Sequence, residues 1–252
     1  MRAAVVAALL STVALAGCAA PAADATEGRF LVVAVKPGTA ARALETSGLP
    51  AALVEDLNAN LRLARDVEVA AADCGEANAF YDPETRRITM CHDLLEHVRA
   101  LFEAAGHDDA SAVENAVRTW TFVFFHEAGH AIIDVNGIPA TGREEDAVDQ
   151  LSALIVLAEE GGEGVALSAA EWFALEAGSA DPDEASFADA HSLDAQRFHN
   201  ILCWVYGSDP DRFADLAGGD GLTAERAEGC PEEYARMRAA WDALLGPWWK
   251  AA

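Results

Sequence analysis

Basic residues are scarce in this sequence. Lys and Arg number 17 and Asp and Glu number 42 among 252 residues, so the formal net charge is -25 at pH 7. Such a chain has no broad positive face that could displace counterions from phosphates, and we exclude a nucleic acid as its partner. With 52% hydrophobic residues and a mean hydropathy of +0.09, the chain is too apolar for an acidic disordered protein. Its length suits one large domain or two small ones.

The apolar run at the N-terminus is too short for a membrane span, which needs about 20 residues. It extends from Ala3 to Leu10, follows Arg2 and gives way to small residues, as in a secretory signal peptide. It ends in Leu15-Ala16-Gly17-Cys18 and resembles the signal of bacterial lipoproteins, in which the cysteine is lipidated and becomes the mature N-terminus. We expect residues 1–18 to be a lipoprotein signal peptide; the alternative is an ordinary signal peptide with a chance cysteine.

Residues 19–28 have the composition of a flexible tether. Ala19 directly follows the cysteine, and by the same resemblance this indicates the outer membrane of a double-membrane bacterium. Two or more acyl chains on Cys18 would anchor the protein stably. The predicted location is therefore the bacterial cell envelope, lipid-anchored and facing the periplasm, with secretion as the alternative.

The sequence lacks any Cys-x-x-Cys spacing. Once Cys18 is set aside, four cysteines remain for an oxidising compartment: Cys74, Cys91, Cys203 and Cys230. Of the three pairings, we favour the nearest-neighbour scheme, Cys74–Cys91 and Cys203–Cys230, because it closes two local loops. A four-cysteine metal site is the alternative, which the spacing disfavours.

Residues 29–252 contain no clear linker and predict one α+β domain. The expected elements are short strands first and helices after them. The strands are expected at 30–35, 67–70, 79–81 and 87–90, the last two as a hairpin, and helices from Pro50, over 92–105, through most of the later chain and over 231–245. This order predicts a small, mostly antiparallel sheet followed by a helical half.

Residues 116–134 are apolar nearly all round and predict a buried helix. It contains His126-Glu127-Ala128-Gly129-His130. The two histidines are four residues apart, share a helix face and can bind one metal ion. Glu127 can then act as general base toward a water beside the metal. Because buried ionisable groups are costly unless they are paired or bind a metal, we prefer this interpretation to a structural histidine pair.

A third ligand should come from the next helix. Gly137 to Ala140 breaks the first helix, and residues 147–158 form a second, almost wholly apolar stretch. Between them, Thr141 and Glu144 have the spacing of a capping box, which would turn Glu144 toward its own backbone. Two buried helices joined by a short loop can bring their facing turns together.

Three acids occupy the first turn of this second helix: Glu144, Glu145 and Asp146. Glu145 shares a helix face with Asp149, so we choose Glu145 as the third metal ligand. Asp149 could accept the second ring N–H of a ligating histidine and fix its tautomer. Glu144 and Asp146 remain open as alternatives, and compensation of the helix dipole would also explain the acidic triplet.

These motifs resemble the zincin metallopeptidases, in particular those whose third ligand is a glutamate on a second helix. More closely, three segments resemble an uncharacterised family of bacterial metallopeptidases that is defined only as a domain of unknown function. They are Phe125 to Ile133, Gly142 to Leu154 and Gln196 to Pro210. The interval from His130 to Glu145 is shorter than in most glutamate zincins.

The resemblance implies a zincin-like fold with one Zn²⁺ per chain and a peptide or protein as substrate. A twisted sheet would cover the metal-binding helix, and an edge strand, Arg87–Met90, would pair with the extended substrate. The oxyanion would need a further hydrogen-bond donor. Candidates for this donor are His191, His199 and Tyr206, whereas His92, His97 and His107 are expected at the solvated surface.

The leading hypothesis is therefore a zinc-dependent peptidase anchored in the bacterial envelope. A zinc amidase that acts on cell-wall peptides is an alternative with the same chemistry. A non-catalytic lipoprotein that uses a zincin scaffold to bind a partner is an alternative from another class. The presence of Glu127 favours an enzyme over this scaffold.

Overall fold

The computed structural model describes residues 28–35, 44, 48–179, 181–219 and 221–250. The predicted signal peptide, with Cys18, and the predicted tether up to residue 27 lie outside the described residues. Within this part the four strands, with one helix among them, come first and the other helices follow, so the α+β prediction is confirmed.

The sheet has four strands: β1 (Phe30–Val35), β2 (Val67–Ala72), β3 (Ala79–Asp82) and β4 (Arg87–Cys91). Their order is β1-β2-β4-β3. β1 and β4 both run parallel to β2, and only the hairpin of β3 and β4 is antiparallel. The prediction of a mostly antiparallel sheet is therefore wrong. Helix α2 (Leu49–Asn60) lies between β1 and β2 in the chain, and such a helical crossover returns the chain in the same direction.

The strand Arg87–Cys91 also differs from its predicted position at the sheet edge. It lies between β2 and β3, because β4 pairs with β2 on one side and with its hairpin partner on the other. β3 is therefore the edge strand on the side of the helices that follow.

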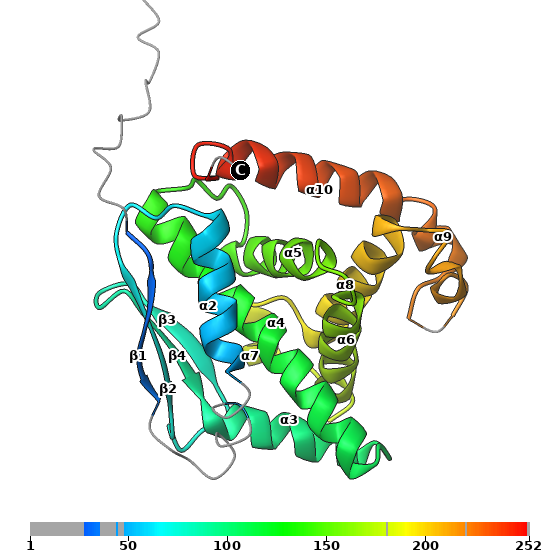
Figure 1. The fold of residues 1–252 in the computed structure, drawn as a ribbon. Helices are drawn as coiled ribbons and strands as arrows, with labels where there is room; N and C mark the ends of the chain where they lie inside the picture. Colours follow the sequence, from blue (N-terminus) through cyan, green and yellow to red (C-terminus); the bar gives the residue numbers. More distant parts are fainter. Residues whose placement is uncertain (1–27, 36–43, 45–47, 180, 220, 251–252) are drawn as a thin grey trace, which may run out of the picture.

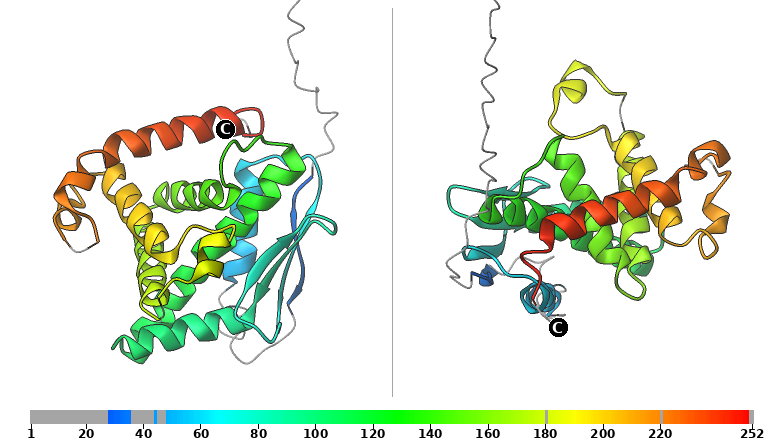
Figure 2. Two further views of the ribbon diagram at one scale, coloured as in Figure 1. Left: turned by 180° about the vertical axis from the view of Figure 1, so that it is seen from behind. Right: turned by 90° about the horizontal axis from the view of Figure 1, so that it is seen from above.

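The helical half follows the sheet in the chain. Its helices are α3 (His92–Ala104), α4 (Asp109–Asn136), α5 (Glu144–Leu157), α6 (Glu163–Ala177), α7 (Glu184–Ala188), α8 (Asp194–Ser208), α9 (Ala224–Ala227) and α10 (Cys230–Leu245). Figures 1 and 2 show the sheet on one side of the molecule and most of these helices on the other. Helix α4 connects the two halves, since it packs against α3, α5 and α6 and also against β3 and β4. None of the helices in the described part of the chain is both long and apolar enough to span a membrane.

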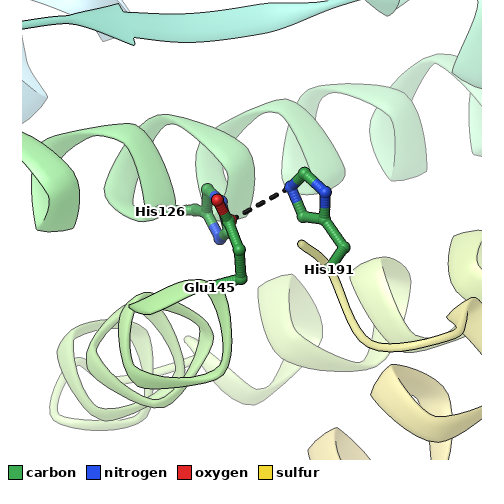
Figure 3. A group of neighbouring side chains, drawn as sticks. All are labelled: His126, Glu145 and His191. Atoms are coloured by element: carbon green, nitrogen blue, oxygen red, sulfur yellow. Dashed lines mark ion pairs between the residues drawn. The ribbon is translucent and has the colours of Figure 1, made fainter. Parts of the chain in front are cut away.

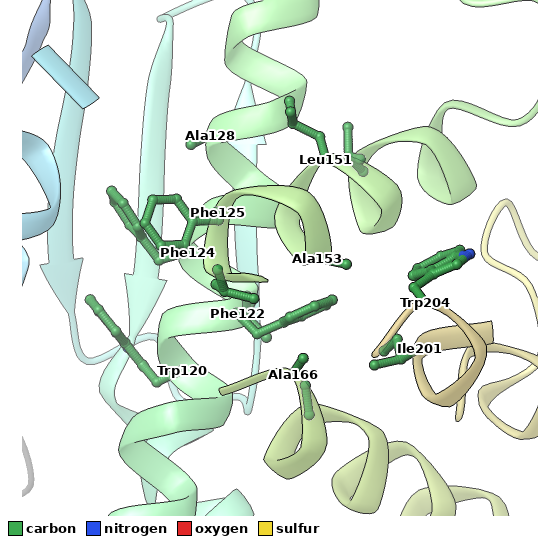
Figure 4. Packing of buried hydrophobic residues seen from close by; sticks show 14 of the residues in the cluster. Trp120, Phe122, Phe124, Phe125, Ala128, Leu151, Ala153, Ala166, Ile201 and Trp204 are labelled. Atoms are coloured by element: carbon green, nitrogen blue, oxygen red, sulfur yellow. The ribbon is translucent and has the colours of Figure 1, made fainter. Parts of the chain in front are cut away.

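Much of the buried core lies along α4. Phe122 and Phe124 are fully buried there, beside Trp120 and Phe125 (Figure 4). This apolar packing explains why α4 is stable as a buried helix, since each aromatic side chain removed from water contributes about 1.5–3 kcal/mol.

Helices α4 and α5 approach each other closely at one glycine. A Cβ atom on Gly129 would lie 2.9 Å from the Cβ of Val148, nearer than van der Waals contact allows. One turn further along α5, the Ser152 hydroxyl donates to the Phe122 carbonyl oxygen over 2.7 Å. Gly129 and this hydrogen bond fix the distance between α4 and α5. That distance decides which side chains of the two helices can contact one another.

Both predicted disulfides are confirmed. Cys74 and Cys91 join the segment after β2 to the end of β4, with Cα atoms 5.5 Å apart. Cys203 and Cys230 join α8 to the first residue of α10, with Cα atoms 5.2 Å apart. The sheet and the last helices are therefore each closed by one covalent link.

Candidate metal centre

Helix α4 presents the His-Glu-x-x-His side chains on its buried length. His126 and Glu127 are 5% and 6% exposed. The rings of His126 and His130 are 5.0 Å apart, as the four-residue spacing on one helix face requires.

The first turn of α5 places Glu145 against both rings. The Glu145 Oε2 atom lies 3.2 Å from His126 Nε2 and 3.2 Å from His130 Nε2. A third imidazole reaches the same oxygen from outside both helices: His191 Nε2 lies 3.0 Å from it (Figure 3). Three ring nitrogens therefore converge on one carboxylate oxygen.

Each of these three rings has a carboxylate behind it. In every case the second ring nitrogen, Nδ1, lies 2.8 Å from a carboxylate oxygen. The pairs are His126 with Asp149, His130 with Glu144, and His191 with Asp189. Because an ionised carboxylate only accepts hydrogen bonds, Nδ1 must carry the proton in each ring. The Nε2 atoms are thereby directed at Glu145 as potential ligands.

This arrangement fits a metal ion. Three Nε2 lone pairs that face a carboxylate oxygen repel it, unless protons or a cation lie between them. Distances of 3.0–3.2 Å are also close to the edge of a tetrahedron with bonds of 2.0 Å, roughly 3.3 Å. The ligand atoms of His126, Glu145 and His191 all lie within 4.8 Å of one another. His130 is not part of this group and meets it through the same Glu145 oxygen, at 3.2 Å. Imidazole and carboxylate ligands suit zinc and related divalent ions.

The charges within the site reinforce one another. Burial raises the pKa of the Glu145 carboxyl, but when protons occupy the centre, hydrogen bonds from the three imidazolium rings hold that pKa well below its usual range. Burial lowers the pKa of His130, whereas Glu145 and Glu144 raise it to about 9. These directions mean that the site stabilises positive charge at its centre, from protons or from a cation.

Glu127 lies in a different environment from Glu145. Its pKa is raised because burial disfavours the charged carboxylate, although the histidines and the backbone N–H of Tyr81 oppose this effect. A raised pKa makes this carboxylate a stronger base than a surface glutamate.

A buried arginine supports the site from behind. Arg197 on α8 donates to both oxygens of Asp149, over 2.8 and 2.7 Å, and its guanidinium lies 3.9 Å above the Phe173 ring. Burial raises the pKa of the Asp149 carboxyl, but Arg197 and His126 hold it well below its usual value. Asp149 is thus fixed as an anion that orients the His126 ring.

A cleft of about 780 Å³ opens over these groups. Its lining includes His126, Glu127, His130, Glu145 and His191. The edge strand β3 forms another part of the wall, with Ala79, Phe80 and Tyr81. The Tyr81 hydroxyl donates to Asp134 Oδ2 over 2.7 Å, which ties this strand to α4. An extended strand therefore lies beside the candidate metal ligands.

The three acids of the α5 first turn have different partners. Glu145 faces the three imidazoles, Glu144 contacts the back of His130, and Asp146 accepts a hydrogen bond from the Ser192 hydroxyl over 2.6 Å. The predicted capping box is wrong: Arg143 is the N-cap residue of α5, without a side-chain cap. Glu144 contacts the imidazole Nδ1 instead of its own backbone.

The remaining histidines and Tyr206 do not all lie where the sequence predicted. His92 is 4% exposed with Nδ1 2.8 Å from Asp73, so its predicted surface position is wrong; it begins α3, directly after the disulfide-bonded Cys91. His97 is exposed, and His107 is half-buried against Glu171. His199 contacts the Gly221 carbonyl oxygen, and neither His199 nor Tyr206 lines the cleft.

The sequence identified neither His191 as a possible metal ligand nor Arg197 as a buried support of the site. His191 precedes α8 and shares no helix face with the other histidines; its proximity to Asp189 is the only local signal. Arg197 lies in α8, and nothing in the local sequence shows that it is buried.

No curated protein and no solved structure matches the chain. A family described as "Putative metallopeptidase" matches residues 35–245, which include α4, α5 and His191. Such a family implies a metal ion and peptidase activity, and the donors around Glu145 are suited to hold that metal. Because the match covers most of its length, the chain belongs to this putative metallopeptidase family.

Proposed function

We propose that the protein is a zinc-dependent peptidase of the zincin type, with His126, His130 and Glu145 as metal ligands and Glu127 as catalytic base. One observation carries this proposal: three imidazole Nε2 atoms lie within 3.2 Å of one carboxylate oxygen, beside a buried glutamate in an open cleft. A divalent ion bound there supplies Lewis acidity, which polarises the peptide carbonyl and makes a nearby water easier to deprotonate.

The side chains of this chain have distinct tasks in the proposed reaction. Asp149 and Glu144 hold the His126 and His130 rings with Nδ1 protonated. Glu127 accepts the proton of the attacking water and passes it to the leaving amine nitrogen. Its burial and its raised pKa support this role, since a carboxylate with a raised pKa accepts a proton more readily than a surface glutamate does.

The substrate backbone is proposed to lie along β3. This strand is at the sheet edge and contributes Ala79, Phe80 and Tyr81 to the cleft wall. An extended peptide that pairs with such an edge presents its side chains alternately toward and away from the cleft. β3 therefore replaces Arg87–Met90 as the strand proposed to bind substrate.

Glu127→Gln tests the function. The change removes the base and keeps the size of the side chain, so hydrolysis of a peptide library should fall by about 100-fold to 10,000-fold. Metal content, measured by elemental analysis, should remain one ion per chain. Glu171→Gln is the matched control, because Glu171 also pairs with a histidine, His107, but does not line the cleft.

The metal ligands are tested in the same assay by His126→Ala, which should lose the metal. Equal metal content in His126→Ala and wild type would show that the ion binds elsewhere. Hydrolysis by Glu127→Gln at the wild-type rate would overturn the role of Glu127. Cell-wall peptides belong in the library, because a zinc amidase would use the same groups on those substrates.

One observation favours the non-catalytic alternative. His126, His130, Glu145 and His191 together offer four protein donors, and sites with four protein ligands are usually structural. A scaffold protein would keep its metal and its partner when Glu127 is changed, and would hydrolyse nothing. The same feature leads to the inference below.

A further inference from the structure

Four potential donors surround the centre, whereas a catalytic metal ion keeps one position open for substrate. If the proposed function holds, one donor must leave during the reaction. The four side chains differ in how firmly the fold holds them, and this difference identifies the one that can leave.

Exposure separates His191 from the other three. The side chains of His126, His130 and Glu145 are 6%, 15% and 19% exposed, whereas that of His191 is 46% exposed. The first three also lie within α4 and α5, two helices held together by the close contact at Gly129. His191 belongs to neither helix. It lies in the segment of residues 181–193, which precedes α8 and contains α7.

Within the centre the His191 ring contacts Glu145 and stacks on His126, with ring centroids 6.1 Å apart. Outside the centre, polar contacts hold the residue in place. The Arg143 guanidinium donates to the His191 carbonyl oxygen over 2.8 Å, and the Ser192 hydroxyl donates to Asp146 over 2.6 Å. Asp189, which pairs with the ring, lies two residues away and would move with it. The first of these contacts is exposed and the second is half-buried, and polar contacts that water can reach exchange readily with it.

The rest of segment 181–193 buries little apolar surface. The Asp183 and Ser186 side chains bond within the segment itself, as a cap of α7. Phe187 is 65% exposed, and no residue of α7 is buried. The segment projects from the body of helices when the molecule is viewed from above (Figure 2, right). Moving it would therefore expose almost no apolar surface to water.

We propose that His191 is an exchangeable fourth ligand, which completes the donor set at rest and withdraws with segment 181–193 when a substrate enters the cleft. The ring is already oriented for ligation, because Asp189 holds the proton on Nδ1 and Nε2 faces Glu145. Ser192, the residue after His191, donates to Asp146 in the first turn of α5. This turn is therefore where the segment docks and releases.

X-ray absorption at the zinc edge, on the full chain loaded with one zinc ion, tests the ligand. Fitting should give three imidazoles in the wild type and two in His191→Ala. His199→Ala is the control, because His199 is a comparably exposed histidine that contacts the Gly221 carbonyl oxygen outside the cleft. Its spectrum should match that of the wild type. An equal imidazole number in His191→Ala and wild type overturns the proposal.

Kinetics test the exchange. At equal zinc loading, His191→Ala should raise kcat/KM on peptides severalfold, because no ligand has to leave before substrate enters. A fall in kcat of about 100-fold, the size expected for loss of a hydrogen bond to the oxyanion, would overturn exchange and make His191 an oxyanion donor. If no variant hydrolyses any peptide, the proposed function fails, while the absorption spectra still decide whether His191 binds the metal.

Discussion

Each imidazole of the candidate centre is oriented by a carboxylate, but only one of these carboxylates is fully enclosed. Asp149 is 3% exposed and is itself held by two hydrogen bonds from Arg197. Glu144 and Asp189 have side chains that are 45% and 57% exposed. We therefore expect Asp149 to contribute both to metal binding and to the stability of the fold, and the other two carboxylates to contribute mainly to ring orientation.

Asp149→Ala should lower metal affinity by about 10-fold to 100-fold, because the His126 ring loses the partner that fixes its tautomer. It should also lower the free energy of unfolding by about 3–5 kcal/mol, because Arg197 is left buried without its counterion. Chelator competition and urea unfolding measure the two effects.

The double variant Asp149→Ala/Arg197→Met separates these effects. Removing the buried guanidinium should recover most of the stability and none of the metal affinity. If the double variant regains both, Asp149 acts on the fold alone, and the proposed orientation of His126 is wrong.

Asp93 offers a test of charge far from the metal centre. Its carboxylate accepts hydrogen bonds from the backbone N–H groups of Cys74 and Gly75, and these bonds hold its pKa below the ordinary value of 3.8. A lowered folded-state pKa stabilises the fold above the unfolded-state pKa, and this stability is lost as the pH falls through the folded-state pKa.

Asp93→Ala should therefore unfold at a lower urea concentration than the wild type at neutral pH. The gap between the two midpoints should close as the pH is lowered below 3.8, because the wild-type carboxyl is then protonated as well. A gap that stays constant in acid would mean that Asp93 stabilises the turn by packing and not by its charge.

The sequence could predict which site residues lie close together when they belong to one helix or to two helices adjacent in the chain. His126, Glu127 and His130 follow from helix periodicity, and the contact of Glu145 with this pair follows from the short loop between two apolar helices. His191 could not be predicted in this way, because its position depends on the path of segment 181–193 across α5. The capping prediction for Glu144 failed because a local rule takes no account of a ring that arrives from another helix.

At the scale of elements, alternation of apolar residues located the strands but not their directions. Val67–Ala70 and Arg87–Met90 appear in the sheet as predicted, yet they are parallel to each other. Which face of a strand is buried depends on its own residues, whereas its direction depends on the connections. The hairpin of β3 and β4 was predicted correctly because a short turn permits only an antiparallel pair.

The contact between α4 and α5 is the element-scale feature on which the site depends. Gly129 allows the helices to approach until Glu145 reaches His126 and His130. A methyl group at this position would meet the Cβ and Cγ1 atoms of Val148, each 2.9 Å away. Val148 is completely buried and β-branched, so it cannot rotate out of the way.

Gly129→Ala should therefore lower the free energy of unfolding by about 1–3 kcal/mol through overpacking, and it should weaken metal binding as α5 is displaced. Adding Val148→Ala should restore metal binding, because the methyl group then has space. Metal titration and urea unfolding of the three variants measure this.

Gly164→Ala on α6 is the control for the general effect of alanine in a helix. Its Cβ would meet only the flexible end of Arg118, at 3.3 Å. It should be neutral or stabilise the protein by up to about 1 kcal/mol. If Gly129→Ala behaves like this control, the close contact does not set the position of Glu145.

At the scale of the whole molecule, the position of the N-terminus bears on the proposed anchor. The described chain enters the fold at Gly28, which pairs with Leu63, and continues into β1. β1 is one edge of the sheet, and β3, which lines the cleft, is the other. A chain tethered before Gly28 would thus be held at the sheet edge remote from the cleft, so a membrane anchor there leaves the cleft accessible.

We therefore expect Cys18→Ala to change the location of the protein and not its chemistry. Without the thiol no acyl chain can be attached, and the short apolar segment before it cannot hold the chain in a bilayer by itself. After expression in a double-membrane bacterium, the wild type should sediment with the outer membrane, and Cys18→Ala should appear in the soluble fraction or remain as uncleaved precursor.

Solubilised in detergent and loaded with the same metal, wild type and mature variant should hydrolyse peptides at equal rates, because two strands separate the tethered sheet edge from the cleft strand. Wild-type protein found entirely in the soluble fraction would show that Cys18 is not an anchor, and a slower variant at equal metal loading would show that the N-terminal segment contributes to the site.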